Sequence, residues 1–345
     1  MIAPDSDRQK DFLMPAVSVI MPVFNAAAFV EEAVSSVLEQ TLQDLELVIV
    51  NDGSTDQSAA ILNRFDDPRI RVLHQANAGQ SAAINRGVQV SCGEFIKIVD
   101  ADDWINPGHL ESQLVSVQGF DHQLSACRWG YFQKDFTRPI LRDEHANRDY
   151  SDPLEWIVDS LTLDEGMMGG WKWLIPRAVW ERSGGYDERL SLNNDFHASI
   201  AILLASAGVR FAPEAVYSYR KGLPGSLSGT RSRRAMQSAL LTTQLGCELL
   251  LLRKDSTEIR KLCGNRFRRW AYDFFPEHPD LANAAEQQAL QLGHDDVPFP
   301  GGRLAQSLCR MLGWRGVRQL QYWGGRIGLQ YLRKRRVAQK LARLN

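Results

Sequence analysis

The sequence predicts an α/β fold in which helices cover both faces of a mostly parallel sheet. Two observations support this prediction. Short apolar runs recur from residue 16 onward, and segments with helical spacing of apolar residues separate them. The runs are continuous rather than alternating, as expected for strands that are buried on both faces. Strands that alternate with helices are typical of a parallel sheet.

The first half of the chain supplies the elements in a regular order. The expected strands are VSVIMPVF (17–24), LELVIVND (45–52), RIRVLHQ (69–75) and EFIKIVD (94–100). The expected helices cover 29–40, 54–62 and 81–90. Glu31 and Glu32 fall in the first turn of the first helix, where negative charge suits the helix dipole. Ser54 is placed to cap the second helix.

Beyond about residue 110 the alternation weakens. Residues 171–190 indicate a strand, a helix and a glycine turn, 195–207 a helix, and 210–220 a strand. Residues 235–292 are expected to be helical, with a linker at 298–302 and further helices after it. The expected divisions are a tail (1–14), an α/β domain (15–228), a helical region (229–300) and a basic tail (301–345).

Composition and charge narrow the class of protein. The chain has 345 residues, 44% of them apolar and 23% charged, which excludes a disordered, collagen-like or coiled-coil protein. Its five cysteines form no CxxC pair, which argues against a disulfide framework and a thiolate zinc site. No signal-peptide core appears at the N-terminus, and the apolar stretch 198–209 is too short to span a bilayer. We therefore expect a cytoplasmic protein.

The formal net charge of −1 conceals an uneven distribution. Residues 303–345 contain eleven Lys and Arg and no Asp or Glu, so the remainder carries a charge of −12. Residues 327–345 have the pattern of a basic amphipathic helix. Two interpretations stay open: the tail lies on an anionic membrane surface, or it docks on the acidic body of the chain. No nucleic-acid partner is expected, because no recognition motif accompanies the charge.

Acidic residues gather where predicted strands end, which is where open parallel sheets bind ligands. Asp100, Asp102 and Asp103 follow the fourth strand. In extended backbone, residues i and i+2 point to the same side, so Asp100 and Asp102 would form a site of hard oxygen ligands. Mg²⁺ or Mn²⁺ suits such a site. The alternative is a solvated Asp-rich turn.

Two further aspartates are candidates. Asp52 ends the second strand and either accepts a hydrogen bond from a base or ribose or shapes the turn at Gly53. Asp195 heads a predicted helix, as a cap, as a base, or as both. No G-x-G-x-x-G follows the first strand and no G-x-x-x-x-G-K occurs, so dinucleotide-binding and P-loop proteins are disfavoured.

Five segments in order, within about residues 16–228, together resemble glycosyltransferase family 2. They are 17–25 (VSVIMPVFN), 48–56 (VIVNDGSTD), 79–87 (GQSAAINRG), 93–103 (GEFIKIVDADD) and 184–188 (GGYDE). The resemblance implies the GT-A fold, which has a Rossmann-like, mostly parallel central sheet with flanking helices. Here a C-terminal helical extension follows it.

The resemblance also implies site residues. The nucleotide would be bound by Pro22, Val23, Asn25, Asp52, Gly79, Asn85, Arg86, Asp100, Ala101, Arg220 and Ser226. Within that set, Asp52 would hold the base, Asp100 would lie near the ribose, and Arg220 and Ser226 would belong to a late loop over the diphosphate. Asp102 would ligate Mn²⁺ or Mg²⁺, and Asp195 would be the catalytic base. The acceptor candidates are Trp104, Trp171 and Asn194, with core packing open for both tryptophans.

The implied activity is inverting transfer of a sugar from a nucleotide-diphosphate donor to a hydroxyl group. UDP is the commonest family nucleotide, and the acceptor would be a saccharide or a lipid-linked molecule in cell-surface polysaccharide or glycoconjugate synthesis. Asn194 and Ile84 depart from the family pattern, which has an acid and often an Arg there. These departures favour an alternative, a catalytically weak nucleotide-sugar-binding or scaffold protein. A nucleotidyltransferase is a second alternative, which the missing glycine-rich loop disfavours.

Overall fold

The computed structural model describes residues 14–163, 166–223, 226, 229–294 and 297–326. Almost all of the expected N-terminal tail and the basic segment 327–345 therefore lie outside the described residues. The chain forms two compact units. The first holds the described residues up to Arg189 and those from Ala198 to 223, and the second holds Leu190–His197 and the described residues from 226 onward.

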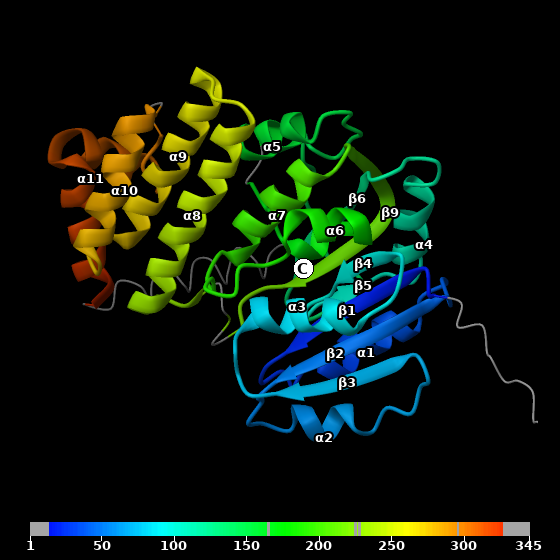
Figure 1. Ribbon diagram of the computed structural model, residues 1–345. Helices are drawn as coiled ribbons and strands as arrows, with labels where there is room; N and C mark the ends of the chain where they lie inside the picture. The colour runs from blue at the N-terminus through cyan, green and yellow to red at the C-terminus, as the bar shows by residue number, and fades with distance from the viewer. Residues whose placement is uncertain (1–13, 164–165, 224–225, 227–228, 295–296, 327–345) are drawn as a thin grey trace, which may run out of the picture. The chain divides into compact units, whose positions relative to one another are not determined.

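The first unit is built on one sheet (Figure 1). Its strands are β1 (Val17–Val23), β2 (Leu45–Asp52), β3 (Ile70–Gln75), β4 (Phe95–Ile98), β5 (Trp104–Ile105), β6 (Leu124–Phe132), β7 (Ile140–Leu141), β8 (Trp173–Pro176) and β9 (Val209–Arg220). The hydrogen-bonded order is β3-β2-β1-β4-β8-β6-β9-β5, and β7 pairs with β6. β1 to β4 are parallel, as predicted, whereas the part beyond β4 is mixed, because β8 runs antiparallel to both β4 and β6.

Helices cover both faces of the parallel half. The helices of this unit are α1 (Val30–Leu38), α2 (Ser58–Leu62), α3 (Gln80–Val90), α4 (His109–Ser116), α5 (Pro153–Thr162), α6 (Arg177–Ser183) and the later part of α7 (Asn194–Ala205). α1 belongs to the core that Val19 and Met21 enter from β1. α3 packs on the opposite face, where a Cβ on Gly87 would lie 2.5 Å from Ile20 Cγ2. Glycine thus permits the close approach of α3 to β1.

The register of the parallel strands brings their carboxyl ends to one edge. Val23 of β1 lies opposite Asn51 of β2, and Asp52 lies opposite Gln75 of β3. On the other side of β1, Ile20 lies opposite Ile98, the last residue of β4. The loops after β1, β2 and β4 therefore start from the same edge of the sheet, as the sequence predicts.

Two helix starts differ from the prediction. α2 begins at Ser58 rather than Ser54, and Ser54 does not cap it: its hydroxyl accepts a hydrogen bond from the Asn25 amide (3.0 Å). The polar side chains of this loop bond to the loop after β1 instead of to the helix. α7 begins at Asn194, so Asp195 lies in its first turn and not at its cap.

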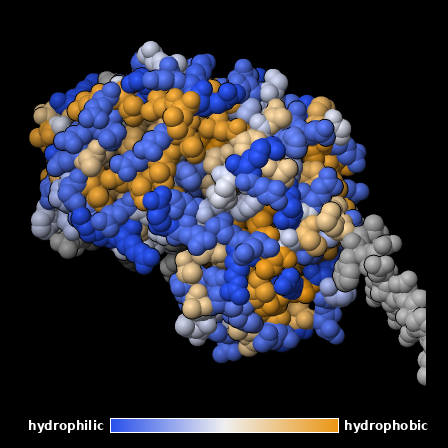
Figure 2. Space-filling view, viewed as in Figure 1, coloured by the Kyte–Doolittle hydropathy of each residue, from blue (hydrophilic) through white to orange (hydrophobic). Residues whose placement is uncertain are grey.

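The second unit contains the helical region. It holds α8 (Arg233–Arg253), α9 (Thr257–Phe274), α10 (Pro279–Leu292) and α11 (Arg303–Arg326). Ser232 and Ser256 cap α8 and α9 through their side-chain oxygens, and Gly313 breaks α11 with a φ of 67°. Hydrophobic residues also reach the visible surface among mostly hydrophilic ones (Figure 2). In the described part of the chain, every helix falls short of the length and apolar character needed to cross a membrane.

Candidate active site

The loops after β1 and β2 are held together by polar side chains. Asn25 accepts a hydrogen bond from the Thr55 amide at Oδ1 (2.8 Å), and its own amide donates to Ser54. Asn25 has a φ of 51°, a left-handed conformation that asparagine adopts more readily than most residues. The Ala27 amide donates to Asp56 Oδ2 (3.0 Å). These hydrogen bonds hold the loops after β1 and β2 against each other at the edge of the sheet.

Asp52 orders the loop that enters α3. Its buried carboxylate accepts hydrogen bonds from the Ala78 amide at Oδ1 (2.8 Å) and the Gly79 amide at Oδ2 (2.8 Å), and from Gln75 Nε2 (2.7 Å). The next residue, Gln80, donates from Nε2 to Asp100 Oδ1 (3.0 Å). One loop thus links the carboxylates that follow β2 and β4, so the two aspartates lie at one site. The sequence analysis did not predict a role for Gln80, although Gln80 directly follows Gly79, which is a candidate nucleotide-binding residue.

The acids after β4 form a turn, so the expectation of extended backbone is wrong there. The Asp103 amide donates to the Asp100 carbonyl (3.2 Å), since β4 has already ended at Ile98. Asp103 is buried and accepts hydrogen bonds from the Tyr217 hydroxyl at Oδ2 (2.9 Å) and the Arg220 amide at Oδ1 (2.7 Å). The Tyr217 hydroxyl in turn accepts from the Asp100 amide (3.2 Å). Asp103 therefore fastens the turn to β9.

Among the described residues, the Asp102 carboxylate lacks the side-chain hydrogen bonds that Asp100 and Asp103 accept, and in this sense it is an open carboxylate. Within the described residues, no other side chain donates a hydrogen bond to it. Burial raises its pKa, and the nearby Arg220 charge counteracts that effect. Burial, together with the charges of Asp102 and Asp100, raises the pKa of Asp103 well above its usual range. No group of three or more His, Cys, Asp or Glu side chains is arranged for a metal in the part of the chain that the structure describes.

Arg220 supports the turn from behind. Its Nε donates to the Asp102 carbonyl (2.7 Å), and one NH2 group pairs with Glu32 Oε2 (2.6 Å). Its guanidinium lies 4.6 Å from the ring centroid of Phe29 and 4.5 Å from that of Phe132. Its charge is therefore engaged inside the unit. The sequence analysis predicted Glu32 only as an acid in the first turn of a helix. Its pairing with Arg220 was not predicted, because 188 positions separate the two residues.

Asn85 and Arg86 lie on α3. The Asn85 amide group exchanges hydrogen bonds with the backbone of Tyr186 (2.8 and 3.0 Å) and donates to Glu188 Oε1 (3.0 Å), which fixes the Gly184–Glu188 segment. Arg86 donates to the Gln75 side chain (3.1 Å). Both line a cavity of about 430 Å³. Ile84 is buried, so it faces the core rather than this cavity.

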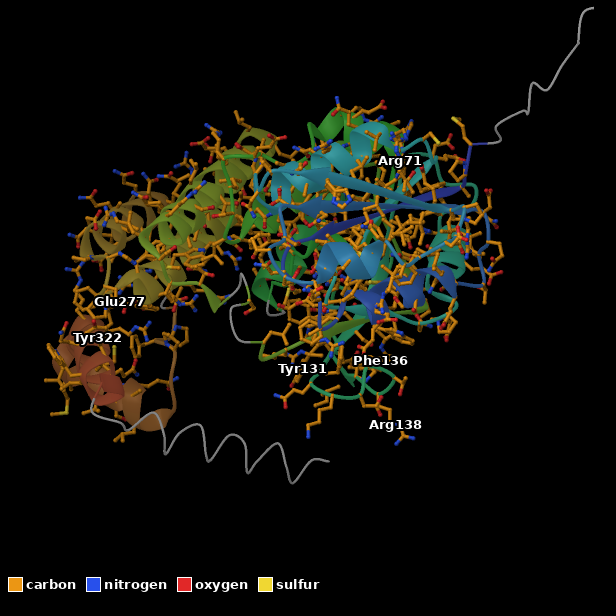
Figure 3. All side chains as sticks on the ribbon, turned by 90° about the horizontal axis from the view of Figure 1, so that it is seen from below. Arg71, Tyr131, Phe136, Arg138, Glu277 and Tyr322 are labelled. Atoms are coloured by element: carbon orange, nitrogen blue, oxygen red, sulfur yellow. The ribbon has the colours of Figure 1, made fainter. Side chains whose placement is uncertain are left out.

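The remaining first-unit candidates fall into two groups. Pro22, Val23 and Ala101 are buried at or just after the carboxyl ends of β1 and β4. Trp171 is buried too and stacks on Tyr217 with ring centroids 4.3 Å apart, so core packing describes it. Trp104 is half-buried, and its ring lies 5.1 Å from Phe136 in the segment between β6 and β7. Figure 3 shows that segment projecting from the unit, with Tyr131, Phe136 and Arg138 labelled.

Asp195 and its neighbours belong to the second unit. The half-buried Asp195 donates from its amide to Asn194 Oδ1 (3.1 Å). Helix α8 holds the residues just before them: Ser238 Oγ accepts from the Ser191 amide (2.7 Å), and Thr242 Oγ1 donates to the Asn193 carbonyl (3.1 Å). The sequence suggested no role for this helix.

Ser226 also belongs to the second unit. Its carbonyl accepts a hydrogen bond from the Gly229 amide (3.0 Å). Residues 224–225 and 227–228 of the same loop, which the resemblance places over the diphosphate, lie outside the described residues. The contacts of Ser226 that are described therefore tie it to its own loop.

Comparisons with known proteins agree on the family. The model of glycosyl transferase family 2 matches residues 18–180. EpsJ of Bacillus subtilis, described as an uncharacterized glycosyltransferase, is 30% identical over 234 residues, which cover 66% of this chain and 67% of EpsJ. The putative glycosyltransferase EpsH of the same organism is 29% identical and covers 72% of each chain.

Solved structures share the fold. S. aureus TarS 1-349 in complex with UDP-GlcNAc is similar with a TM-score of 0.66 and 17% identity, covering 90% of this chain and 92% of that one. The complex of the same protein with UDP has a TM-score of 0.64 and 16% identity, covering 90% and 91%. These likenesses confirm the predicted GT-A fold with a C-terminal helical extension. From its match to the family model and its likeness to EpsJ, the chain belongs to glycosyltransferase family 2.

Proposed function

We propose that the chain transfers a sugar, with inversion at the anomeric carbon, from a nucleoside-diphosphate sugar to a hydroxyl of a saccharide or lipid-linked acceptor. The observation that carries the proposal is the open carboxylate of Asp102, on a turn that Asp103 and Arg220 fasten in place. The proposed donor is a UDP-sugar, because TarS, whose fold this chain shares, has been solved with UDP-GlcNAc and with UDP. Such transfer would serve polysaccharide or glycoconjugate synthesis in the cytoplasm.

The proposed metal is Mn²⁺ or Mg²⁺, held by Asp102. These ions need only one or two carboxylates when diphosphate oxygens and water complete the shell, so one open aspartate beside Asp100 fits them. When bound, the ion would supply Lewis-acid stabilisation of the charge that develops on the departing diphosphate. Arg220 would hold the Asp102 backbone in position, since its own charge is already paired with Glu32.

The nucleotide would lie along the edge formed by the loops after β1, β2 and β4. Asn25, Gly79, Asn85 and Arg86 would contribute to its walls, and Pro22, Val23 and Ala101 would shape its floor. Asp52 would act on the base through the loop that it orders. Asp100 would lie near the ribose, and Ser226 would close over the diphosphate.

Asp195 is the proposed catalytic base. Its carboxylate would take the proton from the acceptor hydroxyl as that oxygen attacks the anomeric carbon from the face opposite the diphosphate. A well-placed general base contributes roughly 10²- to 10⁴-fold to the rate. Asn194 would orient Asp195 through the helix start, and Trp104 would stack against the acceptor sugar.

Nucleotide release from a panel of donors tests this proposal. The full chain is incubated with UDP-, GDP- and dTDP-sugars, saccharide acceptors and Mn²⁺ or Mg²⁺, with EDTA as the control. We expect one nucleotide class to be released, and EDTA to stop its release. Binding of a nucleotide sugar without release, under every condition, would instead favour the catalytically weak binding protein, for which Asn194 is the specific observation.

A further inference from the structure

Helix α9 carries an arginine whose charge no acid neutralises. Arg260 pairs with Asp255 and Arg268 pairs with Glu286, so these two charges on the helix are engaged. Among the described residues, no ion pair or hydrogen bond is recorded for the guanidinium of Arg266. Its Nε is buried and has no acceptor. An unpaired charge at a buried position is costly, so this arginine requires an explanation.

The Arg266 guanidinium is buried at one end only. The residue as a whole is half-buried, and within the described part of the chain Nε is its one nitrogen that is both buried and without a partner. The two terminal NH2 groups therefore stay open to a ligand from solvent. Burial and the nearby charge of Arg269 lower the pKa of Arg266 from 12.5 to about 10. The group thus keeps its positive charge at neutral pH but lacks a counter-charge.

Arg266 lies against the start of α7. Its guanidinium is 4.6 Å from the ring centroid of Phe196, which directly follows the proposed base Asp195. Both α9 and residues 190–197 belong to the second unit. An aromatic ring attracts the charge through its π-face but offers no oxygen to the N–H groups. Phe196 therefore positions the guanidinium and leaves its hydrogen-bonding capacity unused.

A second donor without an acceptor lies at the same helix start. Asn193 Nδ2 is buried, and no partner is recorded for it among the described residues. The Asn193 carbonyl, in contrast, accepts hydrogen bonds from the Phe196 amide (3.0 Å) and from Thr242 Oγ1 (3.1 Å). Donors that lack acceptors, beside the partial positive charge of a helix start, are what an anion requires. They would repel a cation and would be poor neighbours for an apolar group.

We propose that Arg266 binds an oxyanion of the acceptor, a phosphate or a carboxylate, beside the base. The planar guanidinium fits either group through two parallel hydrogen bonds. The assignment to the acceptor rests on the proposed function: Asp195 takes its proton from the acceptor hydroxyl, so the group beside it faces the acceptor and not the departing diphosphate. Acceptors that carry such an oxyanion would then be preferred over neutral saccharides.

Thermal unfolding of the full chain tests the binding, in inorganic phosphate or acetate with the ionic strength matched by NaCl. We expect one of these anions to raise the melting temperature of the parent above its value in NaCl. Arg266→Met should remove that rise, and in NaCl it should melt at least about 2 °C above the parent, because an unpaired buried charge is gone. The matched control is Arg268→Met, which loses the same charge from α9 but breaks a pair with Glu286. It should melt below the parent and keep the response to the anion.

Two results of this assay would overturn the proposal. One is a response to the anions that is the same in Arg266→Met and the parent. The other is Arg266→Met melting well below the parent in NaCl, which would make the arginine a structural residue. If Arg266→Met does not fold, Arg266→Lys keeps the charge without the paired N–H groups and should reduce the response at least about twofold. An undiminished response of Arg266→Lys would count equally against the proposal.

Transfer kinetics test the assignment to the acceptor. Arg266→Met should raise the KM of an acceptor that carries the preferred oxyanion at least about tenfold, and should leave the donor KM unchanged. A raised donor KM with an unchanged acceptor KM would assign the site to the donor diphosphate and overturn the proposal. Because the unfolding assay needs no turnover, failure of oxyanion binding and failure of the proposed activity are separate outcomes.

Discussion

The hydroxyl of Tyr217 should contribute strongly to the stability of the first unit, and Tyr217→Phe removes it alone. The hydroxyl donates to Asp103 Oδ2 (2.9 Å) and accepts from the Asp100 amide (3.2 Å). The ring would keep its stacking on Trp171, at 4.3 Å between centroids. The variant therefore tests the hydrogen bonds and not the packing.

The expected loss follows from burial. Tyr217 and Asp103 are both buried, so water cannot replace the missing hydroxyl. A hydrogen bond to a charged group is worth about 1.5–3 kcal/mol, and an unsatisfied buried group costs about 1–3 kcal/mol. Because these terms overlap, we expect a loss of about 2–4 kcal/mol in the free energy of unfolding. At about 2–4 °C per kcal/mol, the melting temperature should fall by roughly 4–16 °C.

Differential scanning calorimetry measures this change, and Tyr131→Phe is the matched control. Tyr131 is only half-buried, and no hydrogen bond of its hydroxyl is recorded in the described residues, so its loss should cost less than about 0.5 kcal/mol. If Tyr217→Phe melts within about 1 °C of the parent, the fastening of the turn to β9 does not have the energetic role assigned to it.

Three further predictions concern the base, its support and a buried lysine. Asp195→Asn should retain UDP binding and lose roughly 10²- to 10⁴-fold in transfer rate; transfer at the parent's rate would reject the base. Thr242→Val, which removes the bond to the Asn193 carbonyl, should lower kcat without raising the donor KM. Thr243→Val is the control, since the Thr243 hydroxyl donates to the Ala239 carbonyl within α8. If Thr242→Val has the same kcat and KM as the parent, Thr242 does not position the Asp195 segment. Burial lowers the pKa of Lys97 from 10.5 to about 8. Between pH 8 and 10.5, Lys97 is therefore protonated in the unfolded chain but neutral in the folded chain. The free energy of unfolding of the parent, compared with that of Lys97→Met, should rise by about 3 kcal/mol over this pH range in urea titrations. A pH-independent difference would contradict the shift.

The parallel half of the sheet could be predicted because its signals are local. β1 and β2 are continuous apolar runs, and their order fixes where Asp52 and Asp100 emerge. The helix after β2 was predicted four residues too early, because Ser54 has the chemistry of a cap but bonds to Asn25 instead. A local pattern shows that a polar residue needs a partner, but not which partner it finds.

The support of the candidate site could not be predicted for the same reason. Arg220 and Glu32 are separated by 188 positions, and Tyr217 and Asp103 by 114. The antiparallel pairing of β5 with β9, which sets Trp104 opposite Ser218, brings the turn after β4 next to the end of β9. The sequence therefore located the acids, and the structure showed which of them are engaged and which one is open.

Calorimetric titration of UDP into the chain tests the central claim most directly, with and without Mn²⁺. We predict that the parent binds UDP tightly only with Mn²⁺, and that Asp102→Asn loses at least about tenfold in affinity, because a charged contact of this kind is worth more than 1.4 kcal/mol. Equal, Mn²⁺-dependent binding by the parent and by Asp102→Asn would contradict the claim that this carboxylate holds the metal for the nucleotide.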